Sequence, residues 1–83
     1  MNSTTPTVDD LRRLIARHLE LSLVMVDEDD RLHEDLQMDS LELYAVLADA
    51  ETMYGALPEP GTVHNHTTVA ELHAVMLQAR AGQ

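Results

Sequence analysis

Three segments of this chain carry apolar residues at the spacing of an amphipathic helix, and this periodicity constrains the fold more than any other sequence feature. In the first segment the apolar face consists of Val8, Leu11, Leu14, Ile15 and Leu19. Thr7 and Asp10 stand at the N-cap and N3 positions of a capping box, which marks a helix start. We therefore expect the first helix over about residues 8–20.

The second helix is expected to open at Asp39 and Ser40 and to stop at Gly55, a residue typical of helix C-termini. Its apolar stripe consists of Leu43, Val46, Leu47, Ala50 and Tyr54. The last helix begins with a capping box between Thr68 and Glu71. Its apolar face consists of Val69, Leu72, Val75, Met76 and Ala79, and the helix ends near Arg80.

The segments between these helices are expected to be loops. Residues 21–26 alternate weakly, but a single strand would have no partner in this chain, so we predict a loop that packs on the helices. The residues expected to anchor this loop on the core are Leu23, Val26 or Met25, Leu32 and Leu36. The prolines within residues 57–61 forbid regular helix there, whereas residues 62–67 are expected to include a short helix.

The predicted fold class is therefore all-α. We expect a small four-helix bundle with three main helices, a short third helix and a long loop between helices 1 and 2. Residues 1–6 are expected to be a flexible N-terminus, and residues 7–81 the domain.

Charge and length exclude several function classes. The 83 residues carry 15 acidic against 5 basic side chains, a net charge of −10 that disfavours nucleic acid and anionic membranes as partners. The absence of cysteine excludes a disulfide framework and a cysteine nucleophile. Such a short chain leaves no room for a deep catalytic cavity, so we do not expect an enzyme. The chain lacks a signal peptide and a membrane span, which predicts a cytoplasmic protein.

No metal site is expected. Residues 27–38 match only part of an EF-hand loop, because Leu32 replaces the required glycine and Met38 replaces the terminal glutamate. The histidines are not interpreted as a zinc site, which needs three or four convergent ligands. Loop polarity explains His64 and His66, and His18 is expected to be partly exposed.

Ser40 is the candidate functional residue. It follows a long loop and stands at or beside the N-cap of the second helix, a position in which serine is common for structural reasons alone. The nucleophile elbow G-x-S-x-G is absent, because Met38 and Glu42 occupy the glycine positions. We therefore do not interpret Ser40 as a hydrolase nucleophile.

Residues 36–43, Leu-Gln-Met-Asp-Ser-Leu-Glu-Leu, resemble the acyl carrier protein signature with its Asp-Ser-Leu tripeptide. Residues 32–36, the Tyr54-Gly55 pair and residues 67–69 also look like this family, so the resemblance covers roughly residues 7–80. It implies a four-helix bundle in which a phosphopantetheinyl transferase, using coenzyme A and a metal ion, attaches 4′-phosphopantetheine to Ser40. The resemblance also implies that Asp39 takes part in recognition by the transferase.

In this family the second helix is a recognition surface that meets basic side chains of partner enzymes. Carried onto this chain, the implied partner-binding residues are Leu41, Glu42, Tyr44, Asp49 and Glu51. This sequence departs from the family where Ala45, Ala48 and Thr52 replace acidic or Met side chains, which favours a specialised set of partners. Gln37 also stands where a glycine is usual, and a positive φ there would be strained.

The resemblance implies a discrete, monomeric acyl carrier protein that holds acyl intermediates as thioesters and performs no catalysis. The reduced acidic helix and the irregular residues 56–66 favour polyketide or other specialised biosynthesis over fatty acid synthesis. One alternative is an aminoacyl or peptidyl carrier of a nonribosomal-type pathway, which the strong acidity disfavours. The other is a non-covalent helical adaptor in which Ser40 is only a helix cap.

Overall fold

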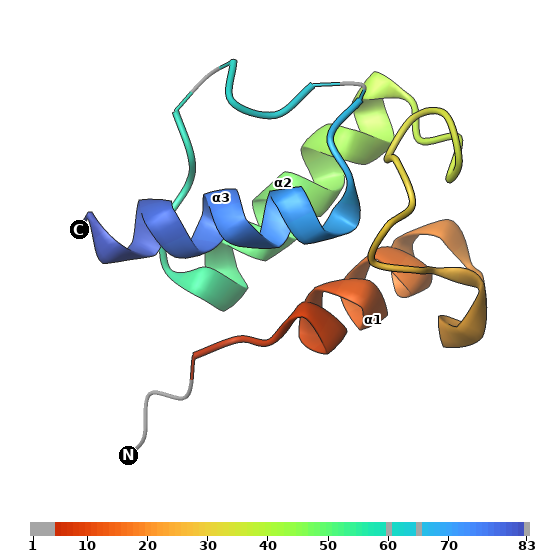
Figure 1. Cartoon of the computed structure of the whole chain (residues 1–83), viewed down its shortest axis with the longest axis horizontal. Helices are drawn as coiled ribbons and strands as arrows, with labels where there is room; N and C mark the ends of the chain where they lie inside the picture. The colour runs from red at the N-terminus through yellow and green to blue at the C-terminus, as the bar shows by residue number, and fades with distance from the viewer. Residues whose placement is uncertain (1–4, 60, 65, 83) are drawn as a thin grey trace.

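The computed structural model describes residues 5–59, 61–64 and 66–82. Its elements are α1 (Val8–Leu19), the 3-10 turn η1 (Leu23–Met25), α2 (Ser40–Tyr54) and α3 (Val69–Ala81). Each of the three α-helices contacts the other two. In Figure 1 the loop between α1 and α2 lies on one side of the bundle, and the segment between α2 and α3 arches over its top. The all-α prediction is confirmed for the described residues, which contain no strand.

The helix starts follow the predicted capping boxes. The Thr7 hydroxyl accepts a hydrogen bond from the Asp10 amide at 3.2 Å, and the Asp10 carboxylate accepts one from the Thr7 amide at 2.9 Å. Thr68 and Glu71 make the same reciprocal pair at the start of α3, at 3.1 and 2.9 Å. These bonds satisfy amides that a helix leaves without partners in its first turn. α2 ends where expected, with Gly55 in the left-handed conformation at φ 79°.

The core is aliphatic apart from Tyr54. The side chains of all three apolar faces meet in one cluster, to which the α1–α2 loop adds several residues. The most deeply buried members are Leu11, Ile15, Val26, Leu32, Val46, Val69, Leu72 and Met76. Tyr54 is buried among them, and its hydroxyl lies 2.7 Å from Nδ1 of His73 on α3. The predicted faces of the first two helices therefore build the core, whereas on α3 Val75 and Ala79 lie outside the cluster and Leu77 packs against it.

The α1–α2 loop is anchored largely as predicted. Val26, Leu32 and Leu36 are buried, whereas Met25 is 60% exposed. The turn η1 was not predicted. It is closed by backbone hydrogen bonds from the Met25 and Val26 amides, and the guanidinium of Arg12 donates to the carbonyls of Leu23 and Val26. One side chain on α1 thus ties down the start of the loop.

The second half of this loop is bonded to the start of α3. The Leu32 amide donates to the Thr67 carbonyl at 2.9 Å, and the Val69 amide donates to the Asp30 carbonyl at 3.0 Å. The Ala70 amide also donates to the Glu28 carbonyl, at 2.8 Å. Amides of the first turn of α3 therefore find partners in the loop, and the loop gains a fixed position against the bundle.

The fourth helix is not confirmed. The described residues of the 62–67 segment, 62–64 and 66–67, form turns and bends. The Thr62 hydroxyl donates to the Glu59 carbonyl at 2.6 Å, and the Thr67 hydroxyl accepts from the His64 amide at 3.0 Å. Such side chain–backbone bonds compete with helical ones, and Gly61 at φ 90° turns the chain out of a helical path. Among the described helices, none is long and apolar enough to cross a membrane.

Candidate functional site

The start of α2 is built around Asp39. Its carboxylate accepts a hydrogen bond from the Glu42 amide at 2.8 Å, and the Glu42 carboxylate accepts one from the Asp39 amide at 3.1 Å. Asp39 is thus the N-cap of a complete capping box, and Ser40 is the first residue of the helix. The structural role that serine most often has at such a position is already filled by its neighbour.

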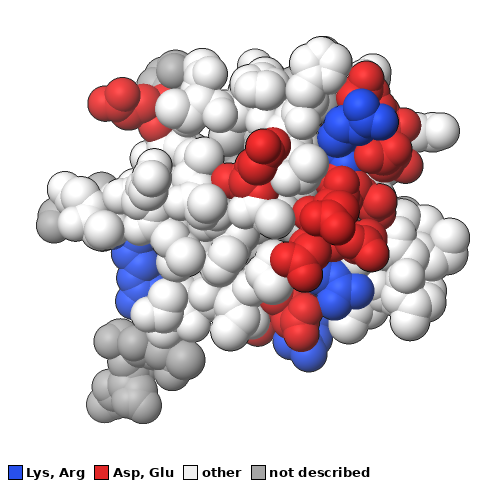
Figure 2. Space-filling model, in the orientation of Figure 1, with Lys and Arg blue, Asp and Glu red and all other residues white. Residues whose placement is uncertain are grey.

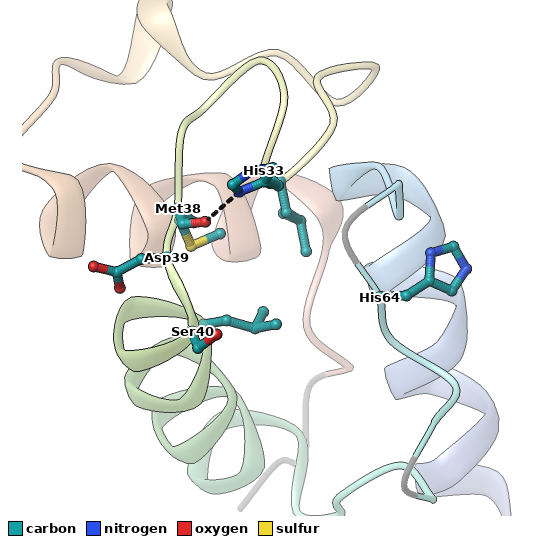
Figure 3. A pocket seen from close by; sticks show the side chains of 7 residues that line it. His33, Met38, Asp39, Ser40 and His64 are labelled. Atoms are coloured by element: carbon teal, nitrogen blue, oxygen red, sulfur yellow. Dashed lines mark hydrogen bonds between the residues drawn. The ribbon is translucent and has the colours of Figure 1, made fainter.

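The Ser40 hydroxyl is free within the part of the chain that the structure describes. The residue is exposed, and its side chain makes no hydrogen bond to any described residue. Figure 3 shows Ser40 on the first turn of α2, with Asp39 pointing away from it and His64 across the pocket with its ring turned outward. No described histidine or carboxylate is hydrogen-bonded to this hydroxyl, whereas a serine activated within its own chain is normally paired with a base.

A shallow pocket adjoins Ser40. It has a volume of about 190 Å³, and its lining residues are Leu32, His33, Met38, Asp39, Ser40, Leu43 and His64. Small-molecule sites usually enclose about 300–1,000 Å³, so this hollow does not form an active-site cavity. It does give a group attached to Ser40 an apolar floor beside its attachment point, and the residues present therefore fit a covalently linked arm.

In the turn before Ser40, Gln37 has the left-handed conformation for which the sequence predicted strain. Gln37 has φ 59°, a conformation in which any non-glycine residue is strained. The Gln37 amide donates to the His33 carbonyl at 2.9 Å, and the next amide, of Met38, donates to the Leu32 carbonyl at 3.0 Å. The Met38 side chain is 3% exposed. The turn is therefore held by its bonds and by a buried anchor in spite of the strain.

A second hollow lies farther along α2. It has a volume of about 440 Å³ and lies between α2 and residues 57–59, 61 and 63. Leu43 lines both hollows. The other residues on its α2 side are Tyr44, Leu47, Ala48 and Glu51. The two hollows therefore border on the same side chain of α2, that of Leu43.

The predicted partner-binding residues occupy different situations. Leu41 and Tyr44 are large apolar side chains that are 78% and 67% exposed, which is unusual in a chain with a small core. The Glu42 carboxylate is engaged in the capping box, and the Asp49 carboxylate lies 2.6 Å from Nε2 of His18 on α1. Glu51 is exposed at the edge of the second hollow. Of the three acidic residues, Glu51 is the one whose carboxylate has no partner among the described residues.

Many of the acidic side chains lie in the α1–α2 loop. Figure 2 shows Asp and Glu side chains gathered where Figure 1 places the α1–α2 loop. Within that loop, the Arg31 amide and then its guanidinium hydrogen-bond to Asp35 and lower the pKa of that carboxyl. The same bond, reinforced by Glu34, raises the pKa of Arg31. One arginine thus compensates two of the carboxylates that precede Ser40.

The chain matches the family model described as "phosphopantetheine attachment site" over residues 9–75, and it belongs to that family. The comparison with curated proteins found no match. The family's domain is the attachment site for covalently bound 4′-phosphopantetheine, and its members are generally non-catalytic carriers that interact with phosphopantetheinyl transferases and biosynthetic enzymes. Among the described residues, no group of three or more His, Asp or Glu side chains is placed to hold a metal ion.

The sequence analysis missed His33. Its ring Nδ1 lies 3.0 Å from the Met38 carbonyl oxygen, inside the turn that leads to Ser40. Nothing in the spacing of the residues indicated this bond, since a histidine in an acidic loop reads as a solvated side chain.

Proposed function

We propose that this chain is an acyl carrier protein whose 4′-phosphopantetheine is attached to Ser40. The observation that carries the proposal is that Ser40 is exposed at the first position of α2 while Asp39 fills the capping role beside it. A serine needed only for the helix would stand at the N-cap position and accept an amide hydrogen bond there. The Ser40 hydroxyl instead remains accessible for covalent modification.

The helix start suits the product of that chemistry. The linkage to Ser40 is a phosphodiester, an anion, and a helix N-terminus presents unpaired amides and a positive dipole end. Asp39 opposes this by placing a carboxylate beside the anion. We infer that Asp39 is retained for its cap and for recognition by the transferase rather than for stabilising the linkage.

The attachment reaction needs an external enzyme. Ser40 Oγ forms a bond to the phosphorus that carries the pantetheine arm of coenzyme A. The bond from that phosphorus to the adenosine bisphosphate leaving group breaks, and the hydroxyl proton passes to a base of the transferase. When bound, the group supplies the thiol that holds acyl cargo as a thioester. The chain itself contributes the nucleophilic oxygen, the rigid helix start and the surface that partners read.

We further propose that the carrier is monomeric and cytoplasmic, and that it performs no catalysis. Its partners would be enzymes with basic docking surfaces that contact α2 at the exposed Leu41 and Tyr44, with Glu42, Asp49 and Glu51 providing charge. The small hollow beside Ser40 and the absence of a described internal base support a non-catalytic role. Electrostatic complementarity of this kind mainly sets association rate and partner choice, which suits brief encounters with several enzymes.

Intact-protein mass spectrometry tests the attachment. The chain is incubated with coenzyme A, magnesium and a promiscuous phosphopantetheinyl transferase, and we expect one phosphopantetheine to be gained. Ser40→Ala should remove the gain completely, while Ser22→Ala, a change at another exposed serine, should leave it intact. The proposal fails if the wild-type chain is not modified under conditions that modify a control carrier. The assignment of Ser40 as the attachment residue fails if Ser40→Ala still gains the group.

The cargo class is a further part of the proposal. Only three acidic side chains are candidates on α2, and residues 56–59 and 61–64 are irregular, which supports polyketide or other specialised biosynthesis over fatty acid synthesis. The net charge of −10 supports acyl cargo over aminoacyl cargo. Loading of the modified protein with malonyl, fatty acyl and aminoacyl donors, followed by mass spectrometry, distinguishes these pathways.

A further inference from the structure

The peptide unit that joins Met38 to Asp39 is held at both of its polar atoms. Nδ1 of His33 lies 3.0 Å from the Met38 carbonyl oxygen (Figure 3), and the Asp39 amide donates to the Glu42 carboxylate at 3.1 Å. Because a peptide unit is planar, fixing its carbonyl and its amide fixes its orientation. This unit leads into Asp39, the N-cap of α2 and the residue before Ser40.

The chemistry of the bond defines the state of His33. A carbonyl oxygen can only accept a hydrogen bond, so Nδ1 must carry the proton. The proton is present on Nδ1 both in the neutral Nδ1–H form and in the imidazolium. His33 therefore acts here as a hydrogen-bond donor, and the contact does not depend on a charge.

His33 also holds the strained residue of the turn. Its backbone carbonyl accepts from the amide of Gln37, at 2.9 Å, and Gln37 is the residue with φ 59°. One residue thus contacts Gln37 through its main chain and Met38 through its ring. The Met38 amide is bonded to the Leu32 carbonyl and the Met38 side chain is buried. The ring of His33 adds a hydrogen bond to the Met38 carbonyl.

We propose that His33 is a positioning residue for the modification of Ser40: its Nδ1–H fixes the Met38–Asp39 peptide and thereby the start of α2 that a phosphopantetheinyl transferase must bind. The inference rests on the proposed attachment at Ser40. Without the ring, the left-handed turn loses one of its restraints and populates other conformations. Only the fraction of molecules with the correct helix start can bind, so the apparent affinity falls by that fraction.

The expected effect appears in KM rather than kcat. Loss of one net hydrogen bond changes the equilibrium constant between this turn and its other conformations about fivefold, which is the largest change it can make in the binding-competent fraction. His33→Ala should therefore raise the KM of the transferase for this carrier by up to about fivefold, with kcat unchanged because the bound complex is the same. His33→Asn should restore the wild-type KM, since its side-chain amide offers an N–H at the same distance from Cβ as Nδ1.

His66→Ala is the matched control. His66 is an exposed histidine whose ring pairs with the side chain of Glu34, and it makes no hydrogen bond to Gln37, Met38 or Asp39 among the described contacts. The four proteins, including wild type, are compared in transferase kinetics at saturating coenzyme A, after circular dichroism has confirmed that each is folded. In addition, ¹⁵N chemical shifts of the ring in the unmodified wild-type protein report which nitrogen of His33 is protonated.

Each outcome decides the inference. A raised KM in His33→Ala that His33→Asn reverses, with Nδ1 protonated, supports it. Equal kinetics of His33→Ala and His66→Ala overturn it and leave the proposed function standing. An Nε2–H form of neutral His33, or a failure of His33→Asn to restore KM, also overturns it. If the wild-type chain is not modified at all, the inference and the proposed function fall together.

Discussion

Asp39 combines two roles that a substitution can separate. Its carboxylate caps α2 through the Glu42 amide, and the family resemblance assigns the same carboxylate to recognition by the transferase. Asparagine has an oxygen in the same place and is as good an N-cap as aspartate, whereas alanine has none.

We predict that Asp39→Ala lowers the free energy of unfolding by about 1 kcal/mol, and that Asp39→Asn changes it by only a few tenths. Both variants should be modified more slowly, because both lack the charge. Urea unfolding measures the first effect and transferase kinetics the second. If Asp39→Asn is modified as fast as wild type, the carboxylate has no role beyond the cap.

Arg12 shows at the scale of elements how one side chain fixes a loop. Its guanidinium bonds to the carbonyls of Leu23 and Val26 and pairs with Asp9 at 2.8 Å. The neighbouring Arg13 is exposed and makes one ion pair, with Asp10 at 3.4 Å. Arg12 therefore connects α1 to the loop, whereas Arg13 contacts a neighbour within α1.

We predict that Arg12→Ala lowers the free energy of unfolding by about 2 kcal/mol, since it removes two hydrogen bonds from a charged donor, while the Leu23 carbonyl keeps its bond from the Val26 amide. Arg13→Ala should stay within about 0.5 kcal/mol of wild type, as expected for an exposed pair. Urea unfolding of both variants gives the comparison. Hydrogen exchange should quicken at residues 23–26 in Arg12→Ala; unchanged exchange there would contradict the role assigned to this side chain.

The sequence predicted the parts of this fold that depend on neighbours in the chain. The capping pairs lie three residues apart and the apolar faces repeat within a helix, so both are visible as patterns. The doubt about Gln37 also followed from a single position, and its φ of 59° confirms it. By contrast, η1, the bonds from the loop to Val69 and Ala70, and the ring of His33 on Met38 depend on contacts that leave no periodic signal.

At the scale of the whole molecule, the charge of −10 is only partly neutralised within the fold. All five basic residues are arginines, and three of them, Arg12, Arg13 and Arg31, form ion pairs with acidic neighbours in the sequence. These pairs lie on α1 and in the α1–α2 loop. α2 contributes no arginine or lysine, so the charge of its exposed face favours basic partners.

Because the chain has no lysine and no cysteine, the side chains that titrate near pH 10 are its two tyrosines, Tyr44 and Tyr54. Burial, with a smaller contribution from the charge of Asp10, raises the pKa of Tyr54 to about 12, whereas an unfolded tyrosine has a pKa near 10. A raised pKa means that the folded state keeps the phenol neutral while the unfolded state ionises. The stability contributed by neutral Tyr54 is therefore complete below pH 10 and is lost as the pH rises through about 12.

We predict that a Tyr44→Phe protein, in which Tyr54 is the remaining tyrosine, loses about 1.4 kcal/mol of unfolding free energy per pH unit between about pH 10 and 12. Urea unfolding at pH 8 and pH 11 measures the loss, and absorbance at the phenolate wavelength follows the ionisation directly. The double variant Tyr44→Phe/Tyr54→Phe is the control. It lacks the hydrogen bond to His73 at every pH, so it should be less stable throughout but should show no alkaline slope. A slope that persists in the double variant would mean that a group other than Tyr54 opens the bundle in alkali.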